Sequence, residues 1–452
     1  MNAPTIPLRT PVEAELIERF GKLRSALPGT VAVRERRADA FAVFERRGLP
    51  HRRIEEWKYS DLRARLKKAA PLAAKPDAKA AAAALAAAED AFSGVDRHRI
   101  VLVDGYFAVA LSDRDALARE GVEVASLSDL LSKDSAKAAD LLSVPDIAAD
   151  DAAIALNTAF AADGVLVSIA KGARLSKPLQ ILHVATGTAS AVHVRSRIVV
   201  GDSVEATIIE SSVGGAEGSE INILTDYRIG DGAKLTIARL QAAEAGVTHI
   251  ATSLLHVGGK VGLKHLSTEA GADFSRNQTF VTFAGEHSRA DIYGVSMLHG
   301  TRHIDQTLVV DHTVPHCTSA ELFKTVVDDR ASGVFQGKII VERDAQKTNG
   351  KMMSQALLLS EEAEMAAKPE LEIFADDVVC GHGATSGQID DAMLFYLMAR
   401  GIPREQAERL LIEAFLDDAV DAIGDEAIAE VLKGSVSSWL GARNRARAAR
   451  AA

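Results

Sequence analysis

Cysteine is scarce in this sequence, which has only Cys317 and Cys380 among its 452 residues. Two cysteines are too few for a disulfide framework, so the chain is not a small disulfide-stapled scaffold. Aromatic residues make up 5% of the chain, and this disfavours a carbohydrate-binding surface, which relies on aromatic platforms. No apolar run reaches the roughly 18 residues that a membrane-spanning helix requires.

The chain has no excess of positive charge, because 62 Asp and Glu outnumber 52 Lys and Arg and the formal net charge is −10. Nucleic acids and anionic membrane surfaces attract clustered positive charge, so we expect neither a nucleic acid nor a membrane as a partner. The N-terminal segment lacks the basic stretch followed by an apolar one that marks a secretory signal. We therefore expect a cytoplasmic protein with reduced cysteines.

Three common catalytic motifs are missing. The sequence contains no G-x-x-x-x-G-K-[ST] phosphate-binding loop, no G-x-S-x-G and no H-E-x-x-H. These motifs carry nucleotide binding, serine-hydrolase chemistry and zinc-protease chemistry. The chain is therefore not expected to hydrolyse nucleotides by itself.

Apolar periodicity divides the chain into four parts. Residues 1–98 are expected to form an N-terminal helical domain with an alanine-rich linker at about 69–91. Residues 99–163 form a mixed lead-in of a hairpin and helices. Residues 164–385 consist of short apolar runs bounded by Gly or Asp, and residues 386–452 return to a helical pattern.

The β segment contains a weak internal repeat. Val200–Ile208 is echoed by Ile229–Ile237, 29 residues later. A repeat of about 30 residues built from short strands and Gly turns is typical of stacked coils. We therefore predict a mainly β fold, in which a right-handed parallel β-helix (solenoid) core is flanked by N-terminal and C-terminal α-helical domains. The last coil of such a core exposes unpaired backbone and needs a cap or a partner.

Cys380 and His382 stand where the β pattern gives way to the helical one. In an extended strand the two side chains lie on the same side, with Gly381 opposite. A thiolate and an imidazole so placed can bind a soft metal such as iron or copper, or they can simply pack. Two ligands do not make a stable site, so the metal interpretation requires further ligands from a second chain.

Histidines also gather between His299 and His316. His299 and His303 are four residues apart, a spacing that joins two imidazoles on a helix but separates them by roughly 13 Å along a strand. The β context therefore favours a structural or interfacial role, and a metal role stays open.

Several longer motifs are shared with a known family. The chain resembles the SufB/SufD family of iron–sulfur cluster assembly proteins over most of its length, apart from the alanine-rich linker and the tail. The motifs that carry this resemblance are Glu55–Leu62, Leu102–Tyr106, Leu156–Phe160, Asp311–Ser319, Gly333–Lys338, Asp344–Thr348, Lys368–Asp377, Cys380–Thr385 and Leu394–Gly401.

Details of these motifs are similar to the SufD branch of the family. The segment Glu56–Tyr59 is SufD-like, and no cysteine occurs in Leu359–Met365, where SufB carries its cluster-building cysteine. SufB also has Glu at the position of Gly383. The resemblance thus implies a non-catalytic scaffold subunit that does not build a cluster alone.

The resemblance implies partners and site residues as well. It implies pairing with a SufB-like scaffold through the C-terminal end of the β-helix, binding of a SufC-like ATPase through the C-terminal helices, and a homodimer when the chain is alone. His382 and Cys380 become candidate interfacial ligands for iron or a transient iron–sulfur cluster. Leu411, Phe415 and Asp418 on the predicted acidic helix are the candidate contacts of the ATPase.

Two other functions stay open at this point. A purely structural interaction subunit shares every fold prediction. A β-solenoid carbohydrate-active enzyme would need paired carboxylates, and the few aromatic residues disfavour it. The sequence contains no dinucleotide-binding fingerprint that would support flavin binding. Flavin binding therefore stays an open question.

Overall fold

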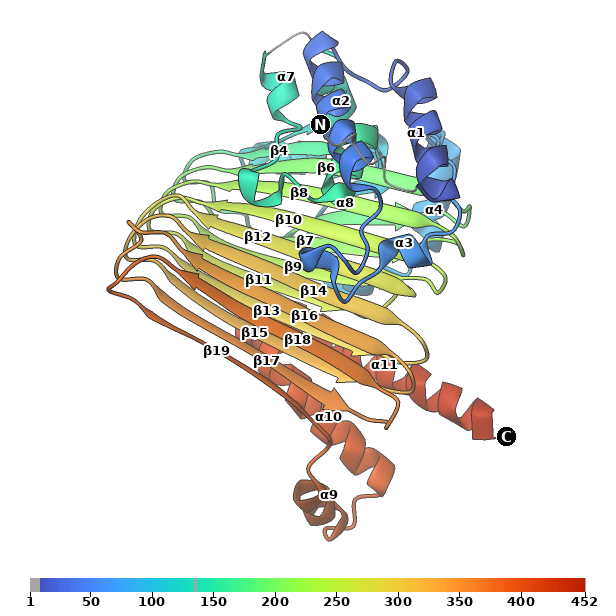
Figure 1. Ribbon diagram of the computed structural model, residues 1–452, viewed down its shortest axis with the longest axis vertical. Coiled ribbons are helices and arrows are strands. Elements are labelled where there is room, and N and C mark those ends of the chain that lie inside the picture. The colour runs from blue at the N-terminus through green and yellow to red at the C-terminus, as the bar shows by residue number, and fades with distance from the viewer. Residues whose placement is uncertain (1–8, 134–135, 452) are drawn as a thin grey trace, which may run out of the picture.

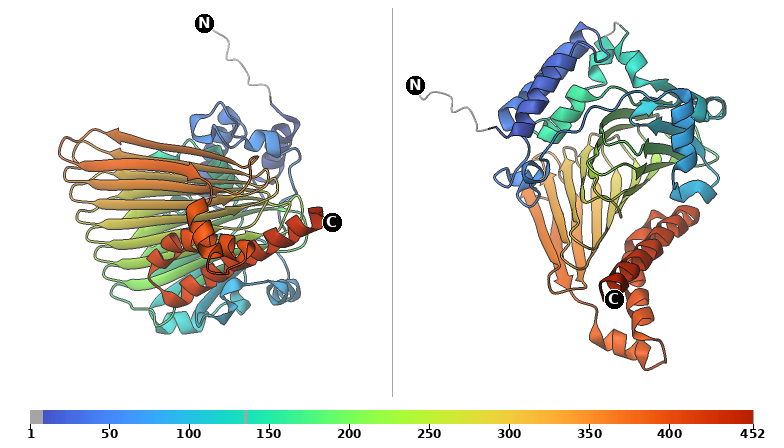
Figure 2. Two further views of the ribbon diagram at one scale, coloured as in Figure 1. Left: turned by 90° about the horizontal axis from the view of Figure 1, so that it is seen from below. Right: turned by 90° about the vertical axis from the view of Figure 1, so that its right-hand side faces the viewer.

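The protein is a solenoid of two facing sheets with helices on both outer faces (Figures 1 and 2). The computed structural model describes residues 9–133 and 136–451. The extreme ends of the predicted terminal domains, residues 1–8 and 452, and residues 134–135 of the lead-in lie outside the described residues.

From β4 onward successive strands alternate between the two sheets, and nearly all neighbours are parallel. One sheet has ten strands: β1 (His98–Val103), β2 (Tyr106–Phe107), β5 (Leu179–Ala185), β7 (Glu205–Gly214), β9 (Lys234–Ala243), β11 (Gly262–Glu269), β13 (Arg289–Leu298), β15 (Thr318–Val327), β17 (Asn349–Leu358) and β19 (Val379–Gly387). The other has nine: β3 (Val122–Ser126), β4 (Val165–Ile169), β6 (Ala191–Val200), β8 (Glu220–Ile229), β10 (Thr248–Val257), β12 (Phe274–Phe283), β14 (His303–His312), β16 (Ser332–Val341) and β18 (Glu364–Ile373).

The ladder register explains the sequence repeat. Val200 lies beside Ile229, and Ile208 lies beside Ile237, so one coil uses 29 residues here. Equivalent apolar side chains then stack between the sheets, and this stacking builds one continuous interior. The mainly β fold, the parallel solenoid and the flanking helices are confirmed.

The solenoid interior also contains polar rows that the apolar repeat did not predict. Buried Arg239 donates to Asn277 Oδ1 at 2.8 Å, and Asn277 Nδ2 donates to Gln306 Oε1 at 2.8 Å. Glu210 lies 3.5 Å from the Arg239 guanidinium. Because these groups bond to one another across adjacent coils, the interior tolerates them.

Several N-terminal helices cover the outer face of the nine-stranded sheet at its first coils (Figure 1), whereas α4 packs on β1 and β5 of the ten-stranded sheet. The rings of Phe20 and Phe41 stack at 4.0 Å, and Phe160 meets both edge-on. The elements before the core are α1 (Pro11–Leu23), α2 (Val31–Arg47), η1 (Glu55–Trp57), α3 (Leu62–Arg65), α4 (Ala78–Ala87), η2 (Ala91–Gly94), η3 (Val109–Leu111), α5 (Arg114–Arg119), α6 (Leu127–Leu131), α7 (Ala136–Asp140), η4 (Asp146–Ala148) and α8 (Ala152–Phe160).

The C-terminal helices cover the outer face of the ten-stranded sheet (Figure 2). They are α9 (Asp391–Met398), α10 (Arg404–Val420), η5 (Asp421–Ile423) and α11 (Glu426–Ala451). Buried Ile412 and Leu416 of α10 join a cluster with Val295 and Val326 of the sheet. None of the helices in the described part of the chain is long and apolar enough to cross a membrane.

Candidate metal and partner site

The last coil leaves an open edge. Within the described residues β19 pairs only with β17, and β18 pairs only with β16. Apolar side chains are exposed along this coil, with Phe374 at 58% and Val379 at 64%. Unpaired strand edges with exposed apolar groups are templates for another chain.

Cys380 and His382 lie on β19 at this edge. Cys380 stands beside Gly350, which stands beside Ser319, and His382 continues the row of Met352 and Glu321. Ser319, Glu321 and Met352 are buried, and Cys380 packs against the interior cluster. Strand alternation therefore turns both Cys380 and His382 toward the interior, on the same side as predicted.

These two side chains offer sulfur and nitrogen without completing a metal site. In residues 9–133 and 136–451, no group of three or more His, Cys, Asp and Glu side chains is placed to hold an ion. Partial burial raises the pKa of the Cys380 thiol, so the group is protonated at neutral pH. A metal that binds there has to displace this proton.

Glu321 is a buried carboxyl that the sequence analysis missed. Its side chain is 3% exposed, and neither oxygen has a hydrogen-bond partner within the described residues. Burial raises the pKa of Glu321 to about 8. A polar residue at an inward position of the repeat is the only sequence signal that points to it.

Glu321→Gln is expected to flatten the dependence of stability on pH. The folded chain holds the Glu321 proton up to about pH 8, whereas an unfolded Glu loses it near 4.5. The stabilisation from the neutral carboxyl is therefore complete below pH 4.5 and falls by about 1.4 kcal/mol per pH unit up to pH 8. Urea unfolding at pH 5 and pH 8.5 measures this slope.

The matched control is Glu364→Gln, which changes an exposed carboxylate on β18. It is expected to keep the wild-type slope between the two pH values. Equal slopes for wild type and Glu321→Gln would contradict a neutral buried Glu321.

The histidines between His299 and His316 do not gather. Buried His303 lies 2.8 Å from Ser60 Oγ, and buried His312 lies 3.0 Å from Ser319 Oγ. Exposed His316 stacks on His287 at 4.8 Å. These contacts give the run structural roles.

The candidate contacts of the ATPase lie on α10. Leu411 and Phe415 are half-buried, and Lys324 of the sheet lies 4.4 Å from the Phe415 ring centroid. Asp418 forms an ion pair with Lys324 at 3.0 Å. These residues help to hold α10 on the solenoid.

The largest exposed apolar side chains of the C-terminal region lie on α9. Met393 is 58% exposed, Phe395 74% and Tyr396 55%. Asp390 caps the helix by accepting from the backbone of Ala392 and Met393. The helix projects from the solenoid (Figure 1), and this apolar surface is exposed to solvent.

Together these features define a class of protein: a helix-flanked parallel solenoid whose final coil has an open strand edge. Comparison with known proteins makes the assignment specific. Residues 183–415 match the family described as "SUF system FeS cluster assembly, SufBD core domain", and residues 13–181 match "SufBD protein N-terminal region". The chain belongs to the SufBD family of iron–sulfur cluster assembly proteins.

Individual relatives agree. The chain is similar to the iron–sulfur cluster assembly protein SufD of Escherichia coli, at 32% identity over 88% of this chain and 90% of the relative. It is 30% identical to a SufBD family protein of Synechocystis, over 83% and 84% of the two chains. A SufD of Bacillus subtilis is 29% identical over 62% of this chain and 64% of that protein.

Proposed function

We propose that the chain is the SufD-like subunit of a scaffold complex for iron–sulfur cluster assembly. It pairs with a SufB-like chain, binds a SufC-like ATPase and is itself non-catalytic. The observation that carries the proposal is the open last coil, which presents Cys380 and His382 at an edge that another solenoid can complete. Iron or a transient cluster is the cargo of this interface.

Ligand chemistry supports an interfacial site. A thiol and an imidazole suit iron, but they fill only part of its coordination sphere. Ligands from the facing coil of the partner supply the remainder. At Gly383 a Cβ would stand 2.8 Å from Met353 Cε, so a larger side chain there would displace Met353.

The negative charge of the last coil favours pairing with a different chain over pairing with a second copy of this chain. Residues 359–388 contain seven carboxylates and one lysine. Two copies that met through this coil would place like charges together, which costs free energy. A homodimer is therefore the weaker form, adopted when the SufB-like chain is absent.

Co-purification tests the proposal. The full chain, produced together with SufB-like and SufC-like partners, is expected to elute with both of them. Under reducing conditions the complex is expected to carry iron and sulfide. If the chain elutes alone at every salt concentration, the proposal is wrong.

Phe395→Ser is expected to weaken ATPase binding by at least about tenfold. Phe395 is 74% exposed, and we expect it to be one of the few hot-spot residues of the dock, each of which contributes about 2 kcal/mol or more. Leu411, Phe415 and Asp418 form the rest of the proposed dock on α10. Titration of the ATPase against the full chain measures the dissociation constant.

The control for this variant is Val109→Ser, which removes an exposed apolar side chain, 47% exposed, in the lead-in. It is expected to leave ATPase binding unchanged. Wild-type affinity in Phe395→Ser would exclude α9 as the dock and leave α10 as the candidate surface.

A further inference from the structure

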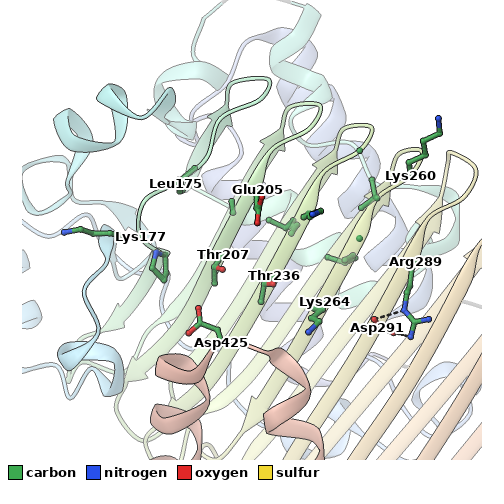
Figure 3. A pocket seen from close by; sticks show the side chains of 18 of the residues that line it. Leu175, Lys177, Glu205, Thr207, Thr236, Lys260, Lys264, Arg289, Asp291 and Asp425 are labelled. Atoms are coloured by element: carbon green, nitrogen blue, oxygen red, sulfur yellow. Dashed lines mark hydrogen bonds and ion pairs between the residues drawn. The ribbon is translucent and has the colours of Figure 1, made fainter.

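A cleft lies between the ten-stranded sheet and the start of α11 (Figure 3). Its volume is about 750 Å³, which falls within the usual range for small-molecule sites. Its floor is the outer face of β7, β9, β11 and β13, and Asp425 stands on the opposite side. It is distinct from the last coil and has no role in the proposed function.

Four cationic residues line this cleft near one glycine. Gly262 stands between Lys234 of β9 and Arg289 of β13 in the ladder. Lys264 is two residues further along β11 on the same face, and Lys260 stands at the turn before it. No other atom lies within 4 Å of where a Cβ would stand on Gly262, so the space above the glycine is open.

The charge of this group is only partly neutralised. Arg289 bonds Asp291 at 2.6 Å, and Lys264 donates to the carbonyl oxygens of Ala422 and Ile423 at 3.0 and 3.3 Å. Lys234 stands beside Glu205 of β7 in the ladder, but neither Lys234 nor Lys260 forms an ion pair with a described residue. Lys234 and Arg289 are two strands apart on this face, and the gap between them lies above Gly262.

The other acidic groups in the cleft are already engaged. Glu205 pairs with Arg174 at 3.3 Å. Asp425 caps α11, where its Oδ1 accepts from the backbone of Ile428 at 3.2 Å. Neither carboxylate is paired with Lys234 or Lys260.

We infer that this cleft binds the phosphate or diphosphate group of a small molecule of nucleotide size. Phosphoryl oxygens accept charge-assisted hydrogen bonds from Lys and Arg. The group fits above Gly262, where Lys234 and Arg289 flank it. Thr207 and Thr236 line the adjoining strands, and Leu175 and Pro178 provide an apolar wall for the body of the ligand.

Gly262→Glu tests the inference with the full chain and no ATPase present. The variant places a carboxylate in the open space between the cations, and no close neighbour opposes it. Pyrophosphate and ATP are the probes, and calorimetry measures their binding. Wild type is expected to bind both probes saturably, and Gly262→Glu to bind each at least about tenfold more weakly.

Gly187→Glu is the matched control, because Gly187 also has no atom within 4 Å of a Cβ and lies outside the cleft. It is expected to bind as wild type does. If Gly262→Glu fails to fold, the double variant Lys234→Gln/Lys260→Gln replaces it with the same expected loss.

Three results would overturn the inference. The first is that neither probe binds the wild type. The second is that sulfate at equal ionic strength competes as well as pyrophosphate, which indicates general attraction of anions. The third is that binding is equal in wild type, Gly262→Glu and the double lysine variant.

Discussion

His382→Ala is expected to lower the iron and sulfide recovered with the reconstituted complex by at least about tenfold, while the chain folds and pairs normally. Removal of groups that merely support a metal ligand already costs 10- to 100-fold, and His382 is proposed as a ligand itself. The side chain is exposed at the open edge and has no recorded hydrogen bond, so the fold does not depend on it.

The measurement is the iron and sulfide content per complex after anaerobic reconstitution, together with the visible absorption of the cluster. Size-exclusion chromatography reports on pairing in the same samples. His382→Cys offers a softer ligand at the same place and is expected to restore part of the cluster.

Thr385→Ala is the matched control, since Thr385 is also exposed on β19 but lies on the outward face. It is expected to leave cluster content unchanged. An undiminished yield in His382→Ala, with pairing intact, would favour the purely structural subunit and would leave the fold assignment in place.

The sequence repeat predicted the solenoid because it reflects the packing of equivalent positions in neighbouring coils. Val200 and Ile229 occupy equivalent positions of neighbouring coils, so the same apolar requirement recurs at the ladder spacing. The same logic placed Cys380 and His382 on one side of a strand at the junction with the helices. A pattern with period 2 determines which face a residue takes once the strand is recognised.

Contacts between residues that are far apart in the sequence produce no such periodic pattern in it. In the sequence, Glu321 cannot be distinguished from other polar residues in strands. Its lack of a hydrogen-bond partner among the described residues depends on which side chains lie across the interior. The cations around Gly262 come from β9, β11, β13 and a turn, and only the register brings them together. The exposure of Phe395 likewise depends on where α9 leaves the solenoid.

Trp57 is a further case in which a contact depends on residues far apart in the sequence. It lies in the motif Glu55–Leu62, but only the structure shows what its ring packs against. Trp57 is 1% exposed, and its Nε1 donates to Asp151 at 3.0 Å. The sheet side of the attachment is Arg276, whose guanidinium lies 3.9 Å from the Trp57 ring centroid.

Arg276→Leu is expected to destabilise the protein by about 3–5 kcal/mol, because it leaves a buried charge without its partner. Arg276 Nη1 bonds Asp305 Oδ2 at 2.5 Å, and the two side chains are 1% and 0% exposed. Arg276 Nη2 also donates to the carbonyl oxygen of Glu56 at 2.7 Å. The variant therefore loses both the compensating charge and the attachment of the N-terminal segment.

Two variants separate these effects. Arg276→Leu/Asp305→Asn removes both charges but keeps an acceptor for Ser60, which donates to Asp305 in the wild type. It is expected to recover part of the loss, since an uncompensated buried charge costs more than an absent pair. Arg174→Leu breaks an exposed ion pair with Glu205, with side chains 79% and 50% exposed, and is expected to cost under about 1 kcal/mol.

Urea unfolding measures the free energies, and limited proteolysis reports on residues 51–60, where the N-terminal segment crosses the sheet. Arg276→Leu is expected to be cut there before the solenoid unfolds, because the backbone of Glu56 then keeps only Gln336 as a donor, at 3.1 Å. Glu55 also pairs with Lys368 of β18, so release of this segment removes a contact from the strand beside the partner edge. Wild-type protease resistance in Arg276→Leu would show that the helices alone hold the segment in place.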